Sequence, residues 1–270
     1  MWYNNTIMMK GGIPVVLTLL FAAVGGGAAT LICGLSPTLS WWWMPLIWCG
    51  GYFAVALVYI LALIGALLLM PQGDPSPRRR RITHRLIRTA LSWVLRTIGY
   101  RIRLCGADKL PISPFLLVCN HLSAFDPLCT MAVLGRDMVF VAKPSVFKIP
   151  VIGTLMRRVG FMPIDRENAR NAVTTIKQAA HCITDDGLSV GIYPEGTRSK
   201  SGDPLPFHAG SFKIASIAKC PVVVAAIRYG KRPLGKQVCL RIADVMDTDY
   251  VTTHNTAAMA DRAVAAITAE

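Results

Sequence analysis

The sequence predicts an α/β domain built on a single mixed β-sheet with helices on its faces, preceded by an N-terminal hairpin of two transmembrane helices. Three observations predict this arrangement. Residues 11–73 contain no charged side chain, and residues 76–110 are strongly basic. From about residue 100, short apolar runs alternate with longer helical stretches, as is typical of one α/β core. We therefore expect a hairpin over residues 1–75, a basic helix over 76–99 and the α/β domain over 100–270.

The charge-free run is long enough to cross a membrane twice. A helix needs about 20 apolar residues to span the hydrocarbon core, and residues 13–35 and 41–70 each provide that length. The tryptophans at 41–43 suit the membrane interface beside the short turn at 36–40. Two alternatives remain open: a signal peptide over residues 1–29, and a buried hairpin of a soluble protein.

The net charge of +14 is unevenly distributed. Residues 76–110 carry ten basic residues and one acidic residue, a net charge of +9, directly after the second apolar stretch. Positive flanks stay in the cytoplasm, so the hairpin is expected to place both termini and the α/β domain on the cytoplasmic side. A basic cluster beside a membrane favours anionic lipid over nucleic acid as the partner, and we expect no nucleic-acid binding.

An apolar stripe continues through the basic segment at helical spacing. Its members, four residues apart, are Ile82, Leu86, Ala90, Val94 and Ile98. The flanking arginines make this a basic amphipathic helix that can lie in the membrane interface. The alternative is that the same stripe packs on the downstream domain.

The α/β domain is expected to contain seven strands and five helices. The strands are expected over residues 101–105, 115–119, 138–142, 161–164, 189–193, 222–227 and 238–242. The helices are expected over residues 127–134, 149–159, 167–184, 211–219 and 256–269. The eight cysteines show no CxxC spacing and no metal-binding pattern with histidine, so we expect no disulfide and no metal site in a reducing compartment.

The string from Asn120 to Pro127 carries the first candidate for chemistry. His121 follows an apolar run at residues 115–119, and Asp126 comes five positions later. Histidine can take a proton near neutral pH, and a carboxylate beside it can fix its tautomer and stabilise the imidazolium. In isolation the pattern also fits a structural interpretation, in which Asp126 caps a helix that begins with Pro127.

Three further strings follow, at residues 160–166, 193–199 and 220–227. The first ends in an arginine, the second is a glycine turn after an apolar strand, and the third is a buried strand that begins with proline. The candidate binding residues in them are Arg166, Glu195, Gly196, Thr197 and Arg198. Arginines beside a glycine turn suit a phosphate, because guanidinium is a planar charged fork and glycine lets the backbone approach.

Together, the four strings resemble the 1-acylglycerol-3-phosphate acyltransferase family of phospholipid synthesis, over about residues 100–230. The NHxxxxD pattern at residues 120–126 and the PEGTRS string at 194–199 are highly specific when they occur in this order. Lys143 lies in a segment that is similar to the family's stretch between the first two motifs. His208 is a departure, because relatives often have lysine there.

The resemblance implies transfer of a fatty acyl group from a thioester to the free hydroxyl of lysophosphatidic acid, giving phosphatidic acid. His121 would be the general base and Asp126 would orient it. Lys143 and the binding residues named above would hold the acceptor. No cofactor is implied beyond the acyl thioester, and both acyl-CoA and an acyl carrier protein remain open as the donor.

Two rival functions remain. The first keeps the chemistry but uses another lysophospholipid, glycerol 3-phosphate or a lyso-aminolipid as the acceptor. The second is a non-catalytic lipid-binding membrane protein. The His121 and Asp126 pair argues against the second, because binding alone does not require a base and its orienting carboxylate.

Overall fold

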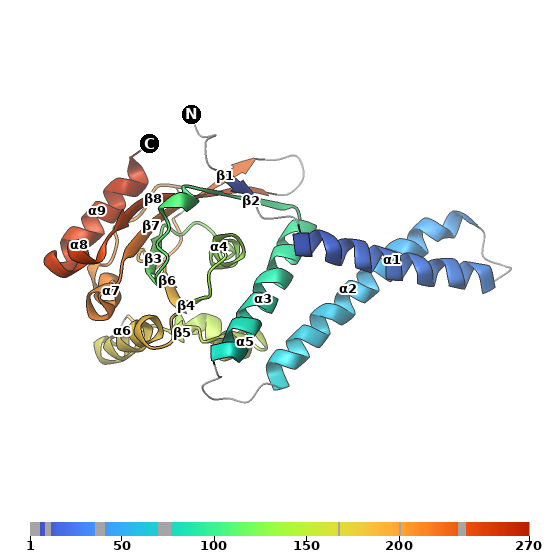
Figure 1. The fold of residues 1–270 in the computed structure, drawn as a ribbon, viewed down its shortest axis with the longest axis horizontal. Helices are drawn as coiled ribbons and strands as arrows, with labels where there is room; N and C mark the ends of the chain where they lie inside the picture. The colour runs from blue at the N-terminus through green and yellow to red at the C-terminus, as the bar shows by residue number, and fades with distance from the viewer. Residues whose placement is uncertain are drawn as a thin grey trace. The chain divides into compact units, whose positions relative to one another are not determined.

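The computed structural model describes residues 6–8, 12–35, 41–69, 77–166, 168–199, 201–231 and 236–269. The chain divides into two compact units. One unit is Lys10–Gly73, and the other comprises Met1–Met9 with Asp74–Glu270. The basic helix that the sequence predicts over 76–99 therefore belongs to the same unit as the α/β domain (Figure 1).

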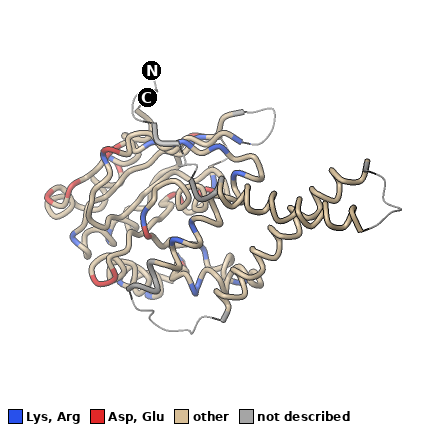
Figure 2. The backbone as a smooth tube through the Cα atoms, turned by 45° about the vertical axis from the view of Figure 1, so that its right-hand side comes forward, with Lys and Arg blue, Asp and Glu red and all other residues tan. Residues whose placement is uncertain are grey.

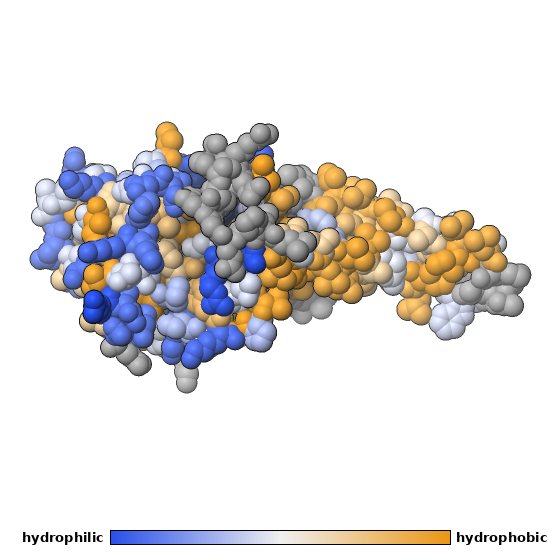
Figure 3. Space-filling model, turned by 90° about the horizontal axis from the view of Figure 1, so that it is seen from below, coloured by the Kyte–Doolittle hydropathy of each residue, from blue (hydrophilic) through white to orange (hydrophobic). Residues whose placement is uncertain are grey.

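The smaller unit is a pair of apolar helices. Helix α1 spans Gly12–Leu35 and helix α2 spans Met44–Leu69, after a 3₁₀ turn at Trp41–Trp43. Both have the length and composition to cross a membrane, and only 17% and 11% of the residues in the two candidate spans are buried. Their surface is apolar (Figure 3), and neither helix contains a Lys, Arg, Asp or Glu (Figure 2).

Glycines allow the two apolar helices to approach each other closely. A Cβ atom on Gly51 would lie 2.8 Å from the carbonyl oxygen of Gly25, closer than such atoms can come. Beside this contact, Trp48 Nε1 donates a hydrogen bond of 3.0 Å to the carbonyl of Ala22. Close backbone approach at small residues is the usual way in which membrane helices pack.

The larger unit is built on one eight-stranded sheet, with the strand order β1-β2-β8-β7-β3-β6-β4-β5. The strands are β1 (Thr6–Met8), β2 (Tyr100–Cys105), β3 (Leu116–Cys119), β4 (Met138–Ala142), β5 (Met162–Pro163), β6 (Ser189–Ile192), β7 (Val222–Lys231) and β8 (Lys236–Met246). The pairs within β7-β3-β6-β4-β5 are parallel, whereas β7 with β8 and β1 with β2 are antiparallel. The predicted single mixed sheet is therefore confirmed.

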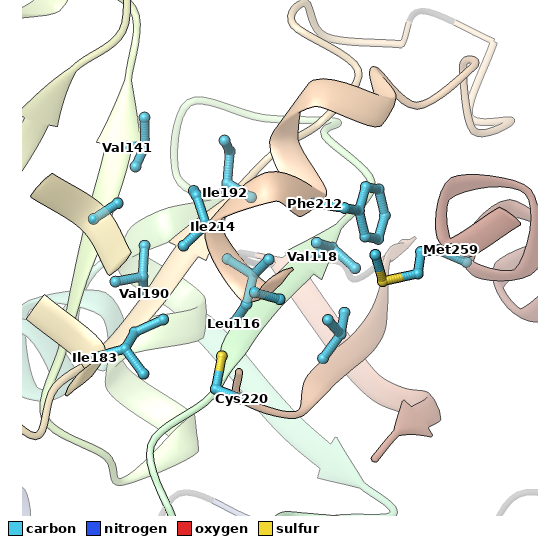
Figure 4. Packing of buried hydrophobic residues seen from close by; sticks show 14 of the residues in the cluster. Leu116, Val118, Val141, Ile183, Val190, Ile192, Phe212, Ile214, Cys220 and Met259 are labelled. Carbon is cyan, nitrogen blue, oxygen red and sulfur yellow. The ribbon is translucent and has the colours of Figure 1, made fainter. Parts of the chain in front are cut away.

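Helices cover both faces of this sheet (Figure 1). They are α3 (Pro77–Thr97), α4 (Asp126–Leu134), α5 (Ile152–Val159), α6 (Ala169–Thr184), α7 (Lys213–Ala218), α8 (Thr248–Thr253) and α9 (Thr256–Thr268). Successive side chains of a strand point to opposite faces of the sheet, so the strands contribute to a hydrophobic core on each face. Leu116 and Val118 of β3 pack with residues of α6, α7, α8 and α9 (Figure 4), whereas Leu117 and Cys119 pack with residues of α3 and α4.

Some elements differ from the sequence prediction. Strand β1 and helix α8 were not expected, because a segment of three or six residues is too short to show a clear period. Helix α5 begins at Ile152 rather than at residue 149. A 3₁₀ turn at Pro144–Lys148 precedes it, and Val151 has a φ of 64°, so the chain cannot enter the helix earlier.

The apolar stripe of helix α3 was predicted either to pack on the downstream domain or to lie in the membrane interface. In its second half, Leu95 is buried in the core, and Ile87 and Leu91 pack against it. In its first half, Ile82 and Leu86 are 50% and 45% exposed. Packing on the downstream domain is therefore confirmed for the second half, and contact of the first half with a membrane stays a prediction.

We expect Gly191 to be irreplaceable in β6, because a Cβ atom there would overlap the ring of the buried Phe140 on β4. Gly191→Ala should lower the free energy of unfolding by about 1–3 kcal/mol, the usual cost of overpacking a core. Gly210→Ala, where nothing lies near the added atom, is the matched control. Denaturant unfolding of the chain in detergent measures both. A cost that stays the same in a Phe140→Leu background would contradict overlap with the ring as the cause.

Candidate active site

The candidate site lies at one edge of the sheet, where parallel strands end. Strands β3, β6, β4 and β5 run in the same direction, so the residues that follow them gather at a common edge. His121 follows β3 and Lys143 follows β4. Arg166 follows β5, and the turn from Glu195 to Arg198 follows β6. Residues that are far apart in the sequence thereby meet.

Asn120 fixes the point at which β3 turns into the site. Its side chain is buried and bridges to β7, because Oδ1 accepts a hydrogen bond of 2.7 Å from Ile227 N and Nδ2 donates one of 3.1 Å to Ile227 O. The amide thus continues the ladder that the strand backbone has ended. The next residue, His121, leaves the strand from a position that the sheet defines.

His121 forms a close pair with Asp126. The distance from His121 Nδ1 to Asp126 Oδ2 is 2.8 Å, and the aspartate is fully buried while the histidine is 20% exposed. An ionised carboxylate can only accept, so Nδ1 carries the hydrogen of this bond. In the neutral imidazole, Nε2 then has the free lone pair. This is the tautomer that a general base needs.

The Asp126 carboxylate is the most heavily hydrogen-bonded group of the site. Besides His121, Oδ2 accepts hydrogen bonds from the backbone N–H of Leu122 (2.7 Å) and of Ser123 (2.8 Å). Oδ1 accepts a bond of 2.6 Å from Tyr229 Oη on β7. A buried carboxylate requires this many donors, because an unsatisfied buried charge is strongly unfavourable.

The predicted helix cap is wrong. Asp126 is the first residue of α4, Phe125 precedes the helix as its N-cap, and no side chain caps this end. The aspartate instead turns back toward the loop before the helix, and binds the N–H groups of Leu122 and Ser123. Its carboxylate therefore orders the loop that carries His121 rather than the helix.

The turn after β6 is tied to both backbone groups of His121. The Oε1 atom of Glu195 accepts a hydrogen bond of 3.3 Å from His121 N, and Ser199 N donates one of 2.8 Å to His121 O. Burial raises the pKa of the Glu195 carboxyl, and the bond from His121 opposes part of that rise. Its Oε2 atom is buried without a hydrogen bond inside the described part of the chain.

Arg166 supports the same turn from β5. Its guanidinium donates hydrogen bonds to the carbonyls of Tyr193 (3.1 Å) and Pro194 (3.4 Å). Gly196 has a φ of 74°, and a Cβ atom there would overlap Arg166 Nη1 and lie 3.3 Å from His208 Nε2. Glycine is thus favoured here by the backbone conformation, and its lack of a side chain leaves room for Arg166 and His208.

The remaining candidates lie on the surface of this edge. Lys143, Thr197 and Arg198 are exposed, and none of them makes a hydrogen bond or ion pair with another described residue. The structure therefore brings His121, Asp126, Arg166, Glu195 and Gly196 into contact through a chain of hydrogen bonds and close approaches. It places the other three at the same edge, where no hydrogen bond or ion pair among the described residues joins their side chains to this group.

Sequence reasoning missed Tyr229. No motif marks it, and it lies 103 residues after Asp126. The one available signal is alternation along β7, because Val223, Ala225 and Ile227 face the side of the sheet that carries α3 and α4. Burial, the hydrogen bond to Asp126 and the charge of Asp126 raise the pKa of the Tyr229 phenol far above its usual range, so it remains a donor.

No group of three or more His, Cys, Asp or Glu side chains that could hold a metal occurs among the residues that the structure describes.

Residues 101–228 match the family model described as Acyltransferase, and this range contains the histidine pair, Arg166 and the turn after β6. This part of the chain, just under half of its length, is therefore similar to the acyltransferase family. The resemblance that the motifs indicate is thereby confirmed.

Curated proteins that are similar to this chain carry a consistent description. A chloroplastic 1-acyl-sn-glycerol-3-phosphate acyltransferase of Brassica napus is 36% identical over 199 residues, which is 70% of this chain and 57% of that protein. A human protein described as 1-acyl-sn-glycerol-3-phosphate acyltransferase alpha is 28% identical over 187 residues, 66% of each chain. The chain thus spans about half to two thirds of the length of these relatives.

A solved structure supports the fold. The 1-acyl-sn-glycerophosphate (LPA) acyltransferase PlsC from Thermotoga maritima superposes with a TM-score of 0.58 at 19% identity, over 95% of this chain and 98% of that one. At this identity the likeness concerns the fold. It agrees with a mixed sheet carrying helices on both faces.

We expect Tyr229→Phe to slow acyl transfer roughly tenfold, because it removes one charge-assisted donor from the carboxylate that orients His121. The change should appear in kcat and leave KM nearly unchanged, since Tyr229 acts through Asp126. Tyr250→Phe on α8, which packs on the other core, is the control. A variant with normal kcat and a raised KM would place Tyr229 in substrate binding and contradict the positioning role.

Proposed function

We propose that this chain is a membrane-anchored 1-acylglycerol-3-phosphate acyltransferase that transfers a fatty acyl group from a thioester to lysophosphatidic acid and releases phosphatidic acid. The observation that carries the proposal is the pair of His121 and Asp126, 2.8 Å apart, with Nε2 of the histidine left as the acceptor. It is supported by the match of residues 101–228 to the family model described as Acyltransferase and by the description of the similar proteins.

The reaction needs a base because an alcohol is a poor nucleophile until its proton is removed. His121 Nε2 takes the proton of the glycerol hydroxyl while that oxygen attacks the thioester carbonyl. The resulting imidazolium donates from Nδ1 to the Asp126 carboxylate, which stabilises its charge. The tetrahedral intermediate then expels the thiolate, which receives the proton from His121. The base is restored, and one ester replaces one thioester.

The acceptor's phosphate would meet the basic residues of the same edge. Arg198 and Lys143 are exposed and uncommitted among the described residues, so both are available to an anion. Arg166 already donates to two carbonyls of the turn, and its remaining N–H groups can point to the phosphate. Thr197 adds a hydroxyl, and Glu195 positions the loop by accepting a hydrogen bond from the His121 backbone.

A membrane location suits these substrates, because the acceptor and product are lipids and the acyl chain avoids bulk water. Helices α1 and α2 would anchor the chain. The four arginines that follow α2, at residues 78–81, favour a cytoplasmic position for the larger unit. The donor would be acyl-CoA or an acyl carrier protein, and no further cofactor is needed for the steps above.

We expect His121→Ala to reduce acyl transfer by roughly 10²–10⁴-fold, the usual loss when a general base is removed. The assay uses the full chain in membranes or detergent, an acyl thioester and 1-acylglycerol 3-phosphate, and it measures phosphatidic acid. Activity close to wild type in this variant would eliminate His121 as the base. A panel of other lysophospholipids, glycerol 3-phosphate and lyso-aminolipids tests the rival acceptors.

We expect Arg198→Ala to act on the phosphate of the acceptor. The variant should raise KM for 1-acylglycerol 3-phosphate by roughly tenfold, as one charge-assisted hydrogen bond is lost. It should change little for 1-acylglycerol, which lacks the phosphate. Arg170→Ala, at an exposed arginine of α6, is the matched control. Equal losses for both acceptors would contradict a phosphate-binding role.

We expect the larger unit to face the cytoplasm. An Ile217→Cys variant on α7 places a thiol at a side chain that is 50% exposed. A membrane-impermeant maleimide should label it in inverted membrane vesicles and not in intact cells. The wild-type chain with its eight native cysteines gives the background. Labelling of the introduced thiol in intact cells would reverse the orientation.

A further inference from the structure

A second basic site lies at the opposite edge of the sheet from His121. It is a hollow of about 470 Å³. Its walls come from segments that immediately precede β3, β4 and β6, at Ile112–Pro114, Gly135–Asp137 and Gly187–Ser189, and from the first half of α3. Because these strands are parallel, the segments before them meet at the edge opposite to the catalytic one. The acyl-transfer chemistry proposed above uses none of these residues.

Arginines dominate the hollow. Arg85 and Arg88 of α3 and Arg136 line it together with one carboxylate, Asp137, so the formal charge of the walls is three positive against one negative, or +2. Arg136 is held in place by a 2.8 Å hydrogen bond to the carbonyl of Pro111. Arg88 Nη1 lies 4.0 Å from Asp137 Oδ1, at the outer limit of an ion pair. The hollow therefore favours an anion.

Arg85 strengthens this conclusion. It is exposed, and it makes no hydrogen bond or ion pair with any other described residue. A guanidinium fork that is already beside a second arginine matches the oxygens of a phosphate. The hydroxyl of Ser113 is a further potential donor in the same wall, whereas the Asp137 carboxylate opposes binding and lowers the net attraction.

The rim of the hollow is apolar. Ile112 is 93% exposed and Ile82 is 50% exposed, and both line the hollow. Leu86, one turn along α3 from Ile82, is 45% exposed. Single exposed isoleucines are common on protein surfaces. Their combination with a cluster of arginines is the composition of a surface that enters the headgroup region of a membrane.

The chain length limits how far this hollow can lie from the membrane. Helix α2 ends at Leu69 and α3 begins at Pro77. The eight residue steps between them extend by at most about 29 Å. Arg85 lies eight residues further along α3, a rise of about 12 Å. If α2 crosses the bilayer, the α3 wall of the hollow cannot leave the membrane surface by more than these lengths.

We propose that the hollow binds the phosphate of an anionic glycerophospholipid of the surrounding bilayer, as an accessory site separate from the catalytic edge. The inference rests on the membrane anchoring proposed above. Helix α3 would connect the bound lipid to the catalytic loop, because α3 leads from the hollow to β2. The first residue of β2, Tyr100, stacks on Phe125 beside the catalytic loop, with the two ring centroids 5.5 Å apart. Lipid at one end of α3 would thus hold the domain that carries His121 at the other end.

The test compares lipid binding between charge variants of the full chain. Native mass spectrometry from detergent micelles measures retention of dioleoyl phosphatidylglycerol against dioleoyl phosphatidylcholine. The wild type should prefer the anionic lipid. The triple variant Arg85→Gln, Arg88→Gln, Arg136→Gln should lose about 100-fold of that preference and Arg85→Gln alone about fivefold, since each cation near an anionic surface contributes about 1 kcal/mol. The single variant keeps the test valid if the triple variant does not fold.

The matched control removes three cations elsewhere. Arg170→Gln, Lys177→Gln, Lys213→Gln changes exposed residues of α6 and α7 and should keep the wild-type preference. Equal losses in both triple variants would show a general charge effect and overturn the proposal. So would binding of inorganic phosphate, with the same dependence on the three arginines, without a preference for the anionic lipid. A raised KM for acyl-CoA with unchanged lipid binding would assign the hollow to the donor and also overturn it.

The lipid-binding test is independent of the proposed reaction, because retention of lipid can be measured without any acyl transfer. His121→Ala should retain the lipid preference of the wild type. A chain that transfers no acyl group to any acceptor but loses lipid with the arginines would refute the reaction and leave the accessory site intact.

Discussion

The site depends on the buried carboxylate of Asp126. A charge removed from water must be matched by donors, and this one has four: an imidazole, two backbone amides and a phenol. Each kind of donor has a different role in the site. The amides shape the loop, the phenol of Tyr229 ties that loop to β7, and the imidazole is held as the tautomer that can accept a proton. Removing the carboxylate would therefore disturb structure and chemistry together.

The turn after β6 is also fixed by several hydrogen bonds. Both backbone groups of His121 are bonded to this turn, and Arg166, which follows β5, donates hydrogen bonds to the same turn. His121 and two of the residues that would bind substrate, Glu195 and Arg166, thus belong to one hydrogen-bonded frame. Such a frame keeps a base within hydrogen-bond reach of its target, which is the main requirement for proton transfer.

The strands and most helices could be predicted because each has enough residues to show its period. The sheet order could not, since β8 lies between β2 and β7 through pairings that no local pattern contains. The same distinction holds at the site. His121, Asp126 and Glu195 stand in recognisable strings. Tyr229 and the amide bridge of Asn120 to Ile227 arise from the register of β3 and β7, which is a property of the folded sheet.

Strand β1 has a topological consequence. Thr6–Met8 pairs with β2, so the chain begins in the larger unit, leaves it for α1 and α2, and re-enters it at α3. A segment that starts and ends in one folded body can cross a bilayer only an even number of times. The pairing of β1 with β2 would therefore make the number of membrane crossings even, whatever the charge of the flanking residues.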